Sequence, residues 1–235
     1  MIMNKNKDSI WIASFDIGKK NFAVYIEEFC PDQIKNLYPI DKKNRYNADG
    51  TPTNQFENVI NKIYDSGRTI FMENTDLTEG CDPSKYLDEN TYYNMVDYLD
   101  CREHIWKLCD HVIIEKQMSF GKRHNTMALK LGQHCWSYFS IKFGRLINIC
   151  EFSAYHKTQS LGAPKIKYKR GKKEYYKSVD KTTRKKWGID KASEILLGRE
   201  EYEALENLLS YKKKDDISDC IIQLQAYKVI NFYDL

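Results

Sequence analysis

The chain has 235 residues, which is enough for one domain with a substantial hydrophobic core, and no internal repeat indicates an array of small units. Its formal net charge of +4 is modest for a protein that binds nucleic acid, so the distribution of charge is more informative than the sum. No apolar run approaches the roughly 20 residues of a transmembrane helix, so we expect no membrane partner.

The N-terminal part of the chain predicts two strands with an acid between them. The apolar run IWIASF comes directly before Asp16, and Gly18 allows a sharp turn shortly afterwards. The next stretch, NFAVYIEEF, is rich in β-branched and aromatic residues and predicts a second strand, antiparallel to the first. Asp16 should therefore lie at the end of a buried strand, although an aspartate in this place can equally be a turn residue.

A second acid follows a predicted helix and strand in the middle of the chain. Residues 38–91 include the polar stretch DKKNRYNADGTPTNQ and predict an insertion or an exposed loop. The amphipathic segment YNMVDYLDCREHIWKLC then predicts a helix, and the apolar run VII predicts a buried strand that ends at Glu115. A strand reached through a helix would pair parallel to the first strand and bring Glu115 beside Asp16. Burying a carboxylate without a compensating cation is costly, which makes Glu115 a candidate ligand.

A further helix is predicted from about 123 to 143, in the sequence GKRHNTMALKLGQHCWSYFS. Met127, Leu131, Cys135 and Tyr138 recur there near helical spacing. Such a stripe most often packs into a core, and the alternative is that it serves a dimer interface.

The segment 157–187 is crowded with cations and predicts a basic DNA-binding loop. Lysine and arginine can neutralise phosphates and release counterions, and the interleaved Tyr168, Tyr175, Tyr176 and Trp187 offer stacking surfaces. The alternative is a solvated loop followed by a basic helix face. The candidate DNA contacts lie in the densest cluster and at the start of the next predicted helix: Lys165, Lys167, Lys169, Arg170, Lys172, Lys173, Lys181, Arg184, Lys185 and Lys186.

Two more acids open the last predicted helix, DDISDCIIQLQAYKVINF. Asp216 and Asp219 are three residues apart and would share one helix face. The N-terminus of a helix also favours negative charge. Asp215 competes with Asp216 for the same role, and either of them could simply cap the helix.

Together, Asp16, Glu115, Asp216 and Asp219 predict one catalytic metal site. Carboxylate oxygens suit hard cations, so Mg²⁺ is the expected cofactor and Mn²⁺ should substitute for it. A pair of such ions can activate a water and stabilise the leaving oxygen of a phosphodiester. The leading interpretation is therefore a nuclease.

The order and contexts of these acids resemble a known family. The phrases SFDIGKKNFA, HVIIEKQ and KKDDISDCIIQ are similar to those of RuvC-type Holliday junction resolvases of the ribonuclease H-like superfamily, most closely to the resolvases of poxviruses and related large DNA viruses. With the helix after HVIIEKQ, the likeness covers most of the chain. By this resemblance, the four acids correspond to the family's metal ligands, with Asp16 as the central one, and the doublet leaves Asp215 as an alternative to Asp216.

The resemblance also implies a fold, a partner and an assembly. The implied fold is α/β and ribonuclease H-like: a five-stranded mixed sheet, its first three strands antiparallel and the others parallel, flanked by helices, in a single domain spanning 1–235. The implied substrate is branched DNA, a four-way junction cut by paired symmetric nicks. Because each subunit of a resolvase nicks one of two opposed strands, the resemblance implies a homodimer.

Other functions fit the same acids. Within the same fold, the chain could cut RNA–DNA hybrids or other branched DNA, because the preference for junctions comes only from the resemblance. From a different class, it could be a non-catalytic nucleic-acid-binding module whose acids cap helices and balance lysines. A nucleotide-binding ATPase-type relative is disfavoured because no second glycine-rich phosphate loop appears in the sequence.

The cysteines bear on the compartment and on zinc. Seven cysteines, an odd number, without a signal peptide predict a reducing intracellular compartment. No C-x-x-C pair supports a zinc site. If the viral resemblance holds, the compartment would be a cytoplasmic viral factory, and a nuclear location stays open.

Overall fold

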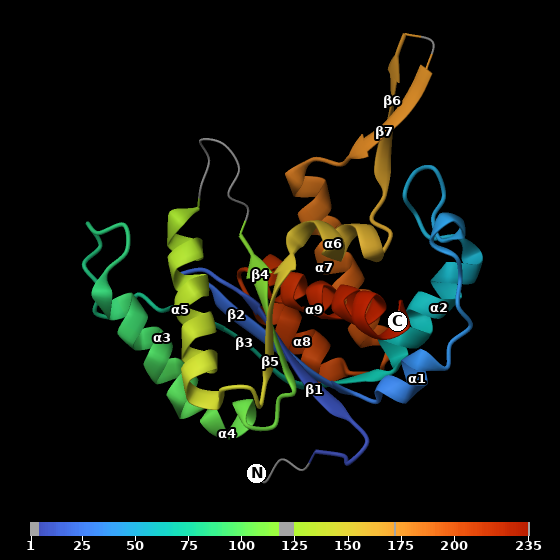
Figure 1. Cartoon of the computed structure of the whole chain (residues 1–235). Coiled ribbons are helices and arrows are strands. Elements are labelled where there is room, and N and C mark those ends of the chain that lie inside the picture. The colour runs from blue at the N-terminus through green and yellow to red at the C-terminus, as the bar shows by residue number, and fades with distance from the viewer. Residues whose placement is uncertain (1–4, 118–124, 172, 235) are drawn as a thin grey trace.

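A five-stranded sheet forms the centre of the computed structural model, which describes residues 5–117, 125–171 and 173–234. The strand order is β3-β2-β1-β4-β5 (Figure 1). The strands are β1 (Ile10–Asp16), β2 (Phe22–Phe29), β3 (Gly67–Thr75), β4 (His111–Lys116) and β5 (Asn148–Ser153).

The pairing of these strands is mixed. β1 pairs antiparallel with β2, and β2 pairs antiparallel with β3. On its other edge β1 pairs parallel with β4, which in turn pairs parallel with β5. This confirms the predicted α/β fold, with a five-stranded mixed sheet whose first three strands are antiparallel and whose other strands are parallel. The register aligns Phe15 with Ile114, so the next residues, Asp16 and Glu115, lie at the same level of the sheet.

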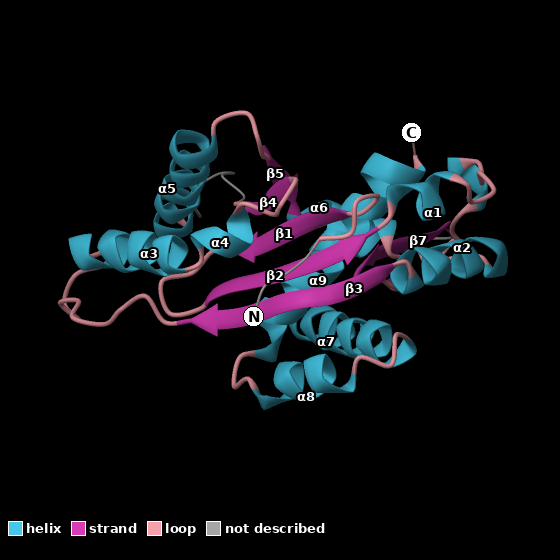
Figure 2. Ribbon diagram, turned by 90° about the horizontal axis from the view of Figure 1, so that it is seen from below, coloured by secondary structure: helices cyan, strands magenta, loops and turns pink. Residues whose placement is uncertain are grey.

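Helices cover both faces of the sheet (Figure 2). Because side chains alternate along a strand, Trp11 and Phe15 of β1 pack on one face and Ile12 packs on the other. The first face is covered by α3 (Glu89–Cys101), α4 (Glu103–Trp106) and α5 (Thr126–Phe143). The second is covered by α1 (Pro31–Lys35), α2 (Asn54–Asp65), α7 (Lys181–Gly198), α8 (Tyr202–Ser210) and α9 (Lys214–Lys228).

α9 is buried along most of its length against this second face. From Ile217 to Lys228 every residue except Asp219 is buried. A helix that is enclosed on all sides can carry polar residues only where they find partners, and Gln223 donates hydrogen bonds to Ser14 Oγ (3.1 Å) and to the Phe15 carbonyl (3.3 Å). These bonds fix the position of α9 along β1.

A cluster of charged side chains is buried between β2 and α9. Glu27 is fully buried and pairs with Lys228 Nζ at 2.6 Å and with Arg199 Nη1 at 2.9 Å. Burial alone would raise the pKa of Glu27, but the two cations hold it at about 2. The first residue of β3, Gly67, has to be a glycine because a Cβ there would lie 2.0 Å from Glu27 Oε1. The cluster therefore depends on both cations and on the absence of a side chain at residue 67.

The segment 38–91 is only partly an insertion. It contains α2 and β3, which belong to the central fold, so the predicted insertion or loop can only be the rest of the segment. Its irregular part includes the short 3₁₀ helix η1 (Lys42–Asn44) and an isolated bridge between Tyr46 and Pro52.

The segment 157–187 is also more ordered than the predicted loop. It contains the end of α6 (Ala154–Ser160), a two-stranded hairpin and the start of α7. The hairpin is formed by β6 (Lys165–Arg170) and β7 (Lys173–Ser178) and projects beyond the rest of the chain (Figure 1). We refer to these two strands as the basic hairpin.

The predicted helix near 123–143 is α5, whose described part starts at Thr126. Leu131 and Cys135 are buried in the core, and Met127 and Tyr138 pack against the same cluster, so the stripe serves core packing. The chain ends in the π-helix η2 (Val229–Tyr233), before the last described residue. Over residues 5–117, 125–171 and 173–234, no helix has the length and apolar character needed to cross a membrane.

Candidate metal centre and nucleic-acid cleft

Three carboxylates meet at one end of the sheet. Asp16, Glu115 and Asp219 each offer an oxygen, and these three atoms lie within 4.8 Å of one another. Asp16 ends β1, Glu115 lies one residue before the end of β4, and Asp219 lies in the second turn of α9. Side-chain alternation places Asp16 with Ile12, and Glu115 with Ile113, on the sheet face that α9 covers. The sheet register and the docking of α9 therefore build this group.

Lys157 of α6 reaches into the carboxylate group. Its Nζ lies 2.8 Å from Asp219 Oδ2 and 3.3 Å from Glu115 Oε1, and its side chain is only 7% exposed. Burial alone would lower the pKa of this ammonium, but Asp219, Glu115 and Asp16 raise it above its ordinary value. Lys157 is therefore a buried, permanently charged member of the site.

The sequence did not identify Lys157 as a site residue. It is one of 37 lysines and arginines in the chain, and it occurs at the start of a segment in which cations are dense. Its position depends on the packing of α6 against α9, which brings it to residues distant in sequence. No local pattern marks such a contact.

The site carries an excess of negative charge. Burial, and next the Glu115 carboxylate, raise the pKa of Asp16 well above its ordinary value, with smaller contributions from Asp219 and Asp216. Lys157 acts in the opposite direction but does not outweigh them. Crowded carboxylates of this kind accept a cation readily, because a cation relieves both the repulsion and the cost of burial.

Asp215 and Asp216 differ in their surroundings. Asp215 accepts a hydrogen bond from Lys185 Nζ. Burial alone would raise the pKa of Asp215, but this hydrogen bond lowers it. Asp216 lines the same cleft as the three carboxylates, and its buried Oδ2 has no hydrogen-bond partner among the described residues.

The free oxygen of Asp216 leaves it available as a ligand, whereas Asp215 is already engaged. Burial, and next the Asp215 carboxylate, raise the pKa of Asp216 to about 6. Asp216 is not part of the group of three oxygens within 4.8 Å, so the structure brings together three of the four predicted acids and leaves the fourth at the edge.

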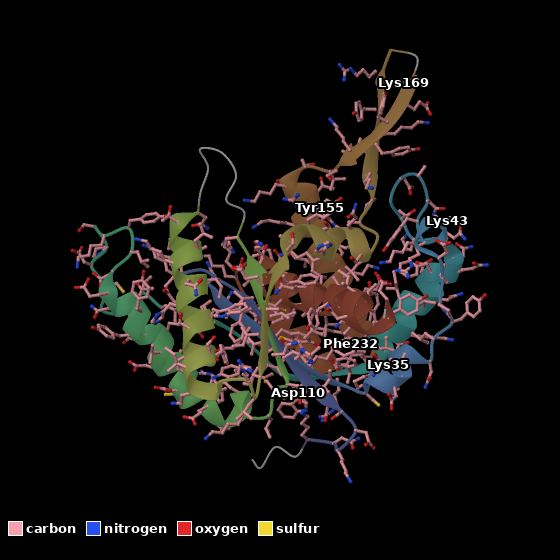
Figure 3. The ribbon with its side chains drawn as sticks, viewed as in Figure 1. Lys35, Lys43, Asp110, Tyr155, Lys169 and Phe232 are labelled. Atoms are coloured by element: carbon pink, nitrogen blue, oxygen red, sulfur yellow. The ribbon has the colours of Figure 1, made fainter. Side chains whose placement is uncertain are left out.

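A cleft with a volume of about 760 Å³ opens above the carboxylates. The residues that line it come from α6, from the base of the basic hairpin and from the start of α7. These three elements lie near one another at the same side of the molecule (Figure 1). Tyr155 of α6 lies at this side of the molecule, and Lys169 lies far out on the hairpin (Figure 3). Four of the predicted DNA contacts line the cleft: Lys165, Lys181, Arg184 and Lys185.

The other predicted contacts lie outside the cleft lining. Lys186 pairs with Asp190 at 2.7 Å on the exposed side of α7. Lys172 falls outside the described residues. The remaining four extend along the basic hairpin: Lys167, Lys169, Arg170 and Lys173. A role of these residues in DNA contact stays a prediction.

The donor set fits a hard divalent cation. Three carboxylate oxygens converge, and the buried Asp216 Oδ2 nearby lacks a partner within the described part of the chain. Oxygen-only donors suit Mg²⁺ or Mn²⁺ rather than zinc, which prefers nitrogen and sulfur. The arrangement can therefore hold a hard cation at the bottom of a cleft with cationic walls.

The solved structures that resemble the chain include two of RuvC. One is a Thermus thermophilus RuvC structure, with a TM-score of 0.48 and 12% identity, matched over 95% of this chain and 98% of that one. The other is T. thermophilus RuvC in complex with Holliday junction substrate, with a TM-score of 0.47 and 10% identity, matched over 93% of this chain and 92% of that one.

Comparison of sequences finds relatives in two viruses, and no family model matches the chain. The chain is 31% identical over 240 residues to uncharacterized protein 170L of Invertebrate iridescent virus 6, across 97% of this chain and 92% of that protein. It is 28% identical over 224 residues to uncharacterized protein 97L of Invertebrate iridescent virus 3, across 92% of this chain and 98% of that protein. The chain therefore belongs to the same family as protein 170L of Invertebrate iridescent virus 6.

Proposed function

We propose that the protein is a metal-dependent endonuclease that resolves four-way DNA junctions. The observation that carries this proposal is the meeting of Asp16, Glu115 and Asp219 at the base of a cleft with cationic walls. Carboxylates alone would repel a polyanion, so cations around them are needed to hold a phosphodiester in place. The choice of the four-way junction rests on the resemblance of the three acidic phrases to RuvC-type resolvases.

The proposed cofactor is Mg²⁺, for which Mn²⁺ would substitute. Asp16, Glu115 and Asp219 would hold it, with Asp16 as the central ligand and Asp216 as the fourth acid. When bound, a pair of such ions supplies an activated water and stabilises the leaving oxygen of the phosphodiester.

The chain's own residues orient and balance this site. Gln223 fixes α9 against β1, and so holds Asp219 beside Asp16. Lys157 offsets part of the negative charge between Glu115 and Asp219. The cations of the cleft walls, among them Lys165 and Arg184, would hold the phosphate backbone above the acids.

The proposed assembly is a homodimer. Resolution of a four-way junction needs nicks in two opposed strands, and the described chain contains one group of converging carboxylates. A second copy would supply the second site. Because the apolar stripe of α5 packs into the core, a dimer interface would have to use other residues.

The proposed compartment is intracellular and reducing. All seven cysteines are free thiols in the structure. Since the relatives found are proteins of invertebrate iridescent viruses, we propose that the protein acts on viral DNA within infected cells.

A strand-resolved cleavage assay tests the function. The substrate is a synthetic four-way junction with each strand labelled in turn, incubated with Mg²⁺, and the comparison substrates are a linear duplex, an RNA–DNA hybrid and a three-way junction. We expect paired symmetric nicks in the four-way junction, and none with Asp16→Asn. Asp32→Asn, which changes an exposed carboxylate of α1 outside the cleft, is the matched control and should cut normally.

Other outcomes of the assay would support one of the alternative functions. Cutting of the hybrid or the three-way junction alone would support the assignment as a nuclease and contradict the four-way junction as its substrate. Binding without cutting under Mg²⁺ or Mn²⁺ would favour a non-catalytic nucleic-acid-binding module, and would overturn the proposal.

A further inference from the structure

The basic hairpin is a separate two-stranded sheet. β6 and β7 pair with each other, and neither is a strand of the central sheet. Ile166, Tyr168, Tyr175 and Tyr176 are all exposed on it. An isolated two-stranded hairpin is marginally stable in water. Its exposed apolar and aromatic side chains therefore indicate a surface that a binding partner covers.

Cations lie on both faces of this ribbon. Residues directly opposite in an antiparallel pair share a face, and the register pairs Lys167 with Tyr176 and Arg170 with Lys173. One face therefore carries Lys165, Lys167 and Lys169, and the other carries Arg170, Lys173 and Lys177. Residues 165–178 contain seven lysines and arginines and a single acid, Glu174. Lys167 pairs with this acid at 2.7 Å.

This distribution of charge distinguishes two ways of meeting DNA. A ribbon that lies flat on a phosphate surface needs cations on one face only. A ribbon inside a groove has a phosphate backbone on each side, which matches cations on both faces. The major groove is about 12 Å wide and admits a two-stranded ribbon, whereas the minor groove is about 6 Å wide and does not. Strands of six residues extend about 20 Å, enough to follow the groove across several base pairs.

Two of the three tyrosines, Tyr168 and Tyr175, act within the ribbon. The rings of Tyr168 and Tyr175 stack on each other with centroids 5.6 Å apart, and Lys177 Nζ lies 5.7 Å from the Tyr168 ring. Because each ring already has a stacking partner, the pair stiffens the ribbon and favours duplex DNA over unpaired bases as the occupant.

The base of the hairpin is held at a fixed place beside the carboxylates. The backbone N–H of Lys165 donates a 2.7 Å hydrogen bond to the Asp49 carbonyl, and Tyr46 Oη donates one of 2.9 Å to the Ser160 carbonyl. Gly162 meets Pro52 so closely that a Cβ there would lie 2.5 Å from Pro52 Cδ. The irregular part of the 38–91 segment thus supports the hairpin. Lys165 and Tyr176, at its base, also line the catalytic cleft.

From these contacts we infer that the basic hairpin enters the major groove of the duplex arm next to the scissile phosphate, with the two phosphate backbones of that groove facing its two cationic faces. The inference rests on the proposed function, because it assumes that the cleft binds DNA. It adds the form in which the DNA is recognised, a duplex arm read from its major groove, and gives the 38–91 segment the role of a support.

Chemical interference mapping tests the inference. A labelled four-way junction is lightly methylated with dimethyl sulfate, which modifies guanine N7 in the major groove and adenine N3 in the minor groove, and a second sample is ethylated at phosphates. Each is bound to the Asp16→Asn protein, and bound and free DNA are separated. We expect guanine N7 methylation on the arm next to each scissile phosphate to exclude DNA from the complex, together with ethylation of phosphates on both strands bordering that groove.

Two double variants in the same background locate the contact. Lys169→Ala with Lys173→Ala removes one cation from each face of the hairpin, and should erase the N7 interference on that arm. Lys35→Ala with Lys62→Ala removes two exposed lysines of α1 and α2, and should leave the pattern unchanged. Circular dichroism and the thermal midpoint check that both variants fold.

Interference by adenine N3, or by phosphates of a single strand without any guanine N7 effect, would overturn the major-groove inference. An N7 pattern that survives in the folded hairpin variant would overturn it as well. If the wild-type protein cuts junctions while either of these results is found, only this inference fails. If the wild-type protein neither binds nor cuts any DNA, the proposed function fails with it.

Discussion

Replacing Asp216 with asparagine should stabilise the metal-free protein at neutral pH, even though Asp216 is proposed to serve the active site. Burial, and next the carboxylate of Asp215, raise the pKa of Asp216 from 3.8 to about 6. Its Oδ2 is buried and accepts no hydrogen bond from the described residues. The native state therefore favours the protonated form of this acid, and holding the charged form at neutral pH costs stability.

The size of the gain follows from the two pKa values. A difference of about two pH units corresponds to about 3 kcal/mol at most, at about 1.36 kcal/mol for each unit. Asp216 is only partly buried, and the N-terminus of α9 favours negative charge, so we halve this to about 1.5 kcal/mol.

The sign of the pH dependence is fixed by the same shift. An acid whose native pKa is raised destabilises the fold fully above its native pKa, here about 6, and not at all below its unfolded value of 3.8. The stability of the wild-type protein, compared with Asp216→Asn, should therefore rise as the pH falls through 6. At pH 5 about half of the difference should remain.

Urea unfolding in EDTA at pH 7.5 and pH 5 measures this difference, and Asp215→Asn is the matched control. Burial alone would raise the pKa of Asp215, but its hydrogen bond from Lys185 lowers it. Asp215→Asn should therefore lose stability at pH 7.5, the opposite sign from its neighbour. A loss of stability in Asp216→Asn at pH 7.5, or a gain that does not shrink at pH 5, would refute the reasoning. Added Mg²⁺ should reduce the advantage of Asp216→Asn, because a cation that binds the native state stabilises the wild-type protein more.

Three further predictions concern the acids, the hairpin and the core. Glu115→Gln should abolish junction cleavage and retain junction binding in a gel-shift assay, because the cations of the cleft walls are unchanged; substantial cleavage would remove Glu115 from the site. Replacing the lysines and arginine from Lys165 to Lys173 with alanine should weaken binding and flatten its dependence on salt, and an unchanged salt slope would reject these residues as phosphate contacts. Arg199→Ala should cost about 3–5 kcal/mol in urea unfolding because it leaves Glu27 with one cation instead of two, while Lys186→Ala, which breaks an exposed pair with Asp190, should cost very little. A similar small loss for Arg199→Ala would show that Lys228 alone compensates the buried charge.

The strands that carry the acids could be predicted from the sequence because their signals are local. Apolar runs indicate β1 and β4, and the acid that follows each run lies at or near the carboxyl end of its strand. The helical spacing of Asp216 and Asp219 is likewise contained within a few residues. The placement of Asp16 and Glu115 on one face of the sheet follows from side-chain alternation and from the parallel pairing of β1 with β4.

Other parts of the fold were missed for physical reasons. β3 is an edge strand of mostly intermediate burial, so its sequence, GRTIFMENT, lacks a continuous apolar run. The basic hairpin has no buried face that would impose an apolar alternation. Its one local signal was Gly171, which has a φ of +65° at the turn between the two strands.

Lysines near the cleft fall into two groups with different physical tasks. Lys157 is buried between Glu115 and Asp219, so its ammonium neutralises carboxylates of the protein itself and is not available to bind a phosphate. Lys165 and Lys181 line the open cleft, where counterions can be exchanged for DNA. One ammonium cannot neutralise three crowded carboxylates, and burial together with the neighbouring carboxylates raises the pKa of Asp16 well above its ordinary value. The metal-free site is therefore left with a deficit of positive charge that a divalent cation can fill. Lys185 of the cleft wall is paired with Asp215, whereas Lys165, Lys181 and Arg184 form no ion pair among the described residues and can hold the polyanion.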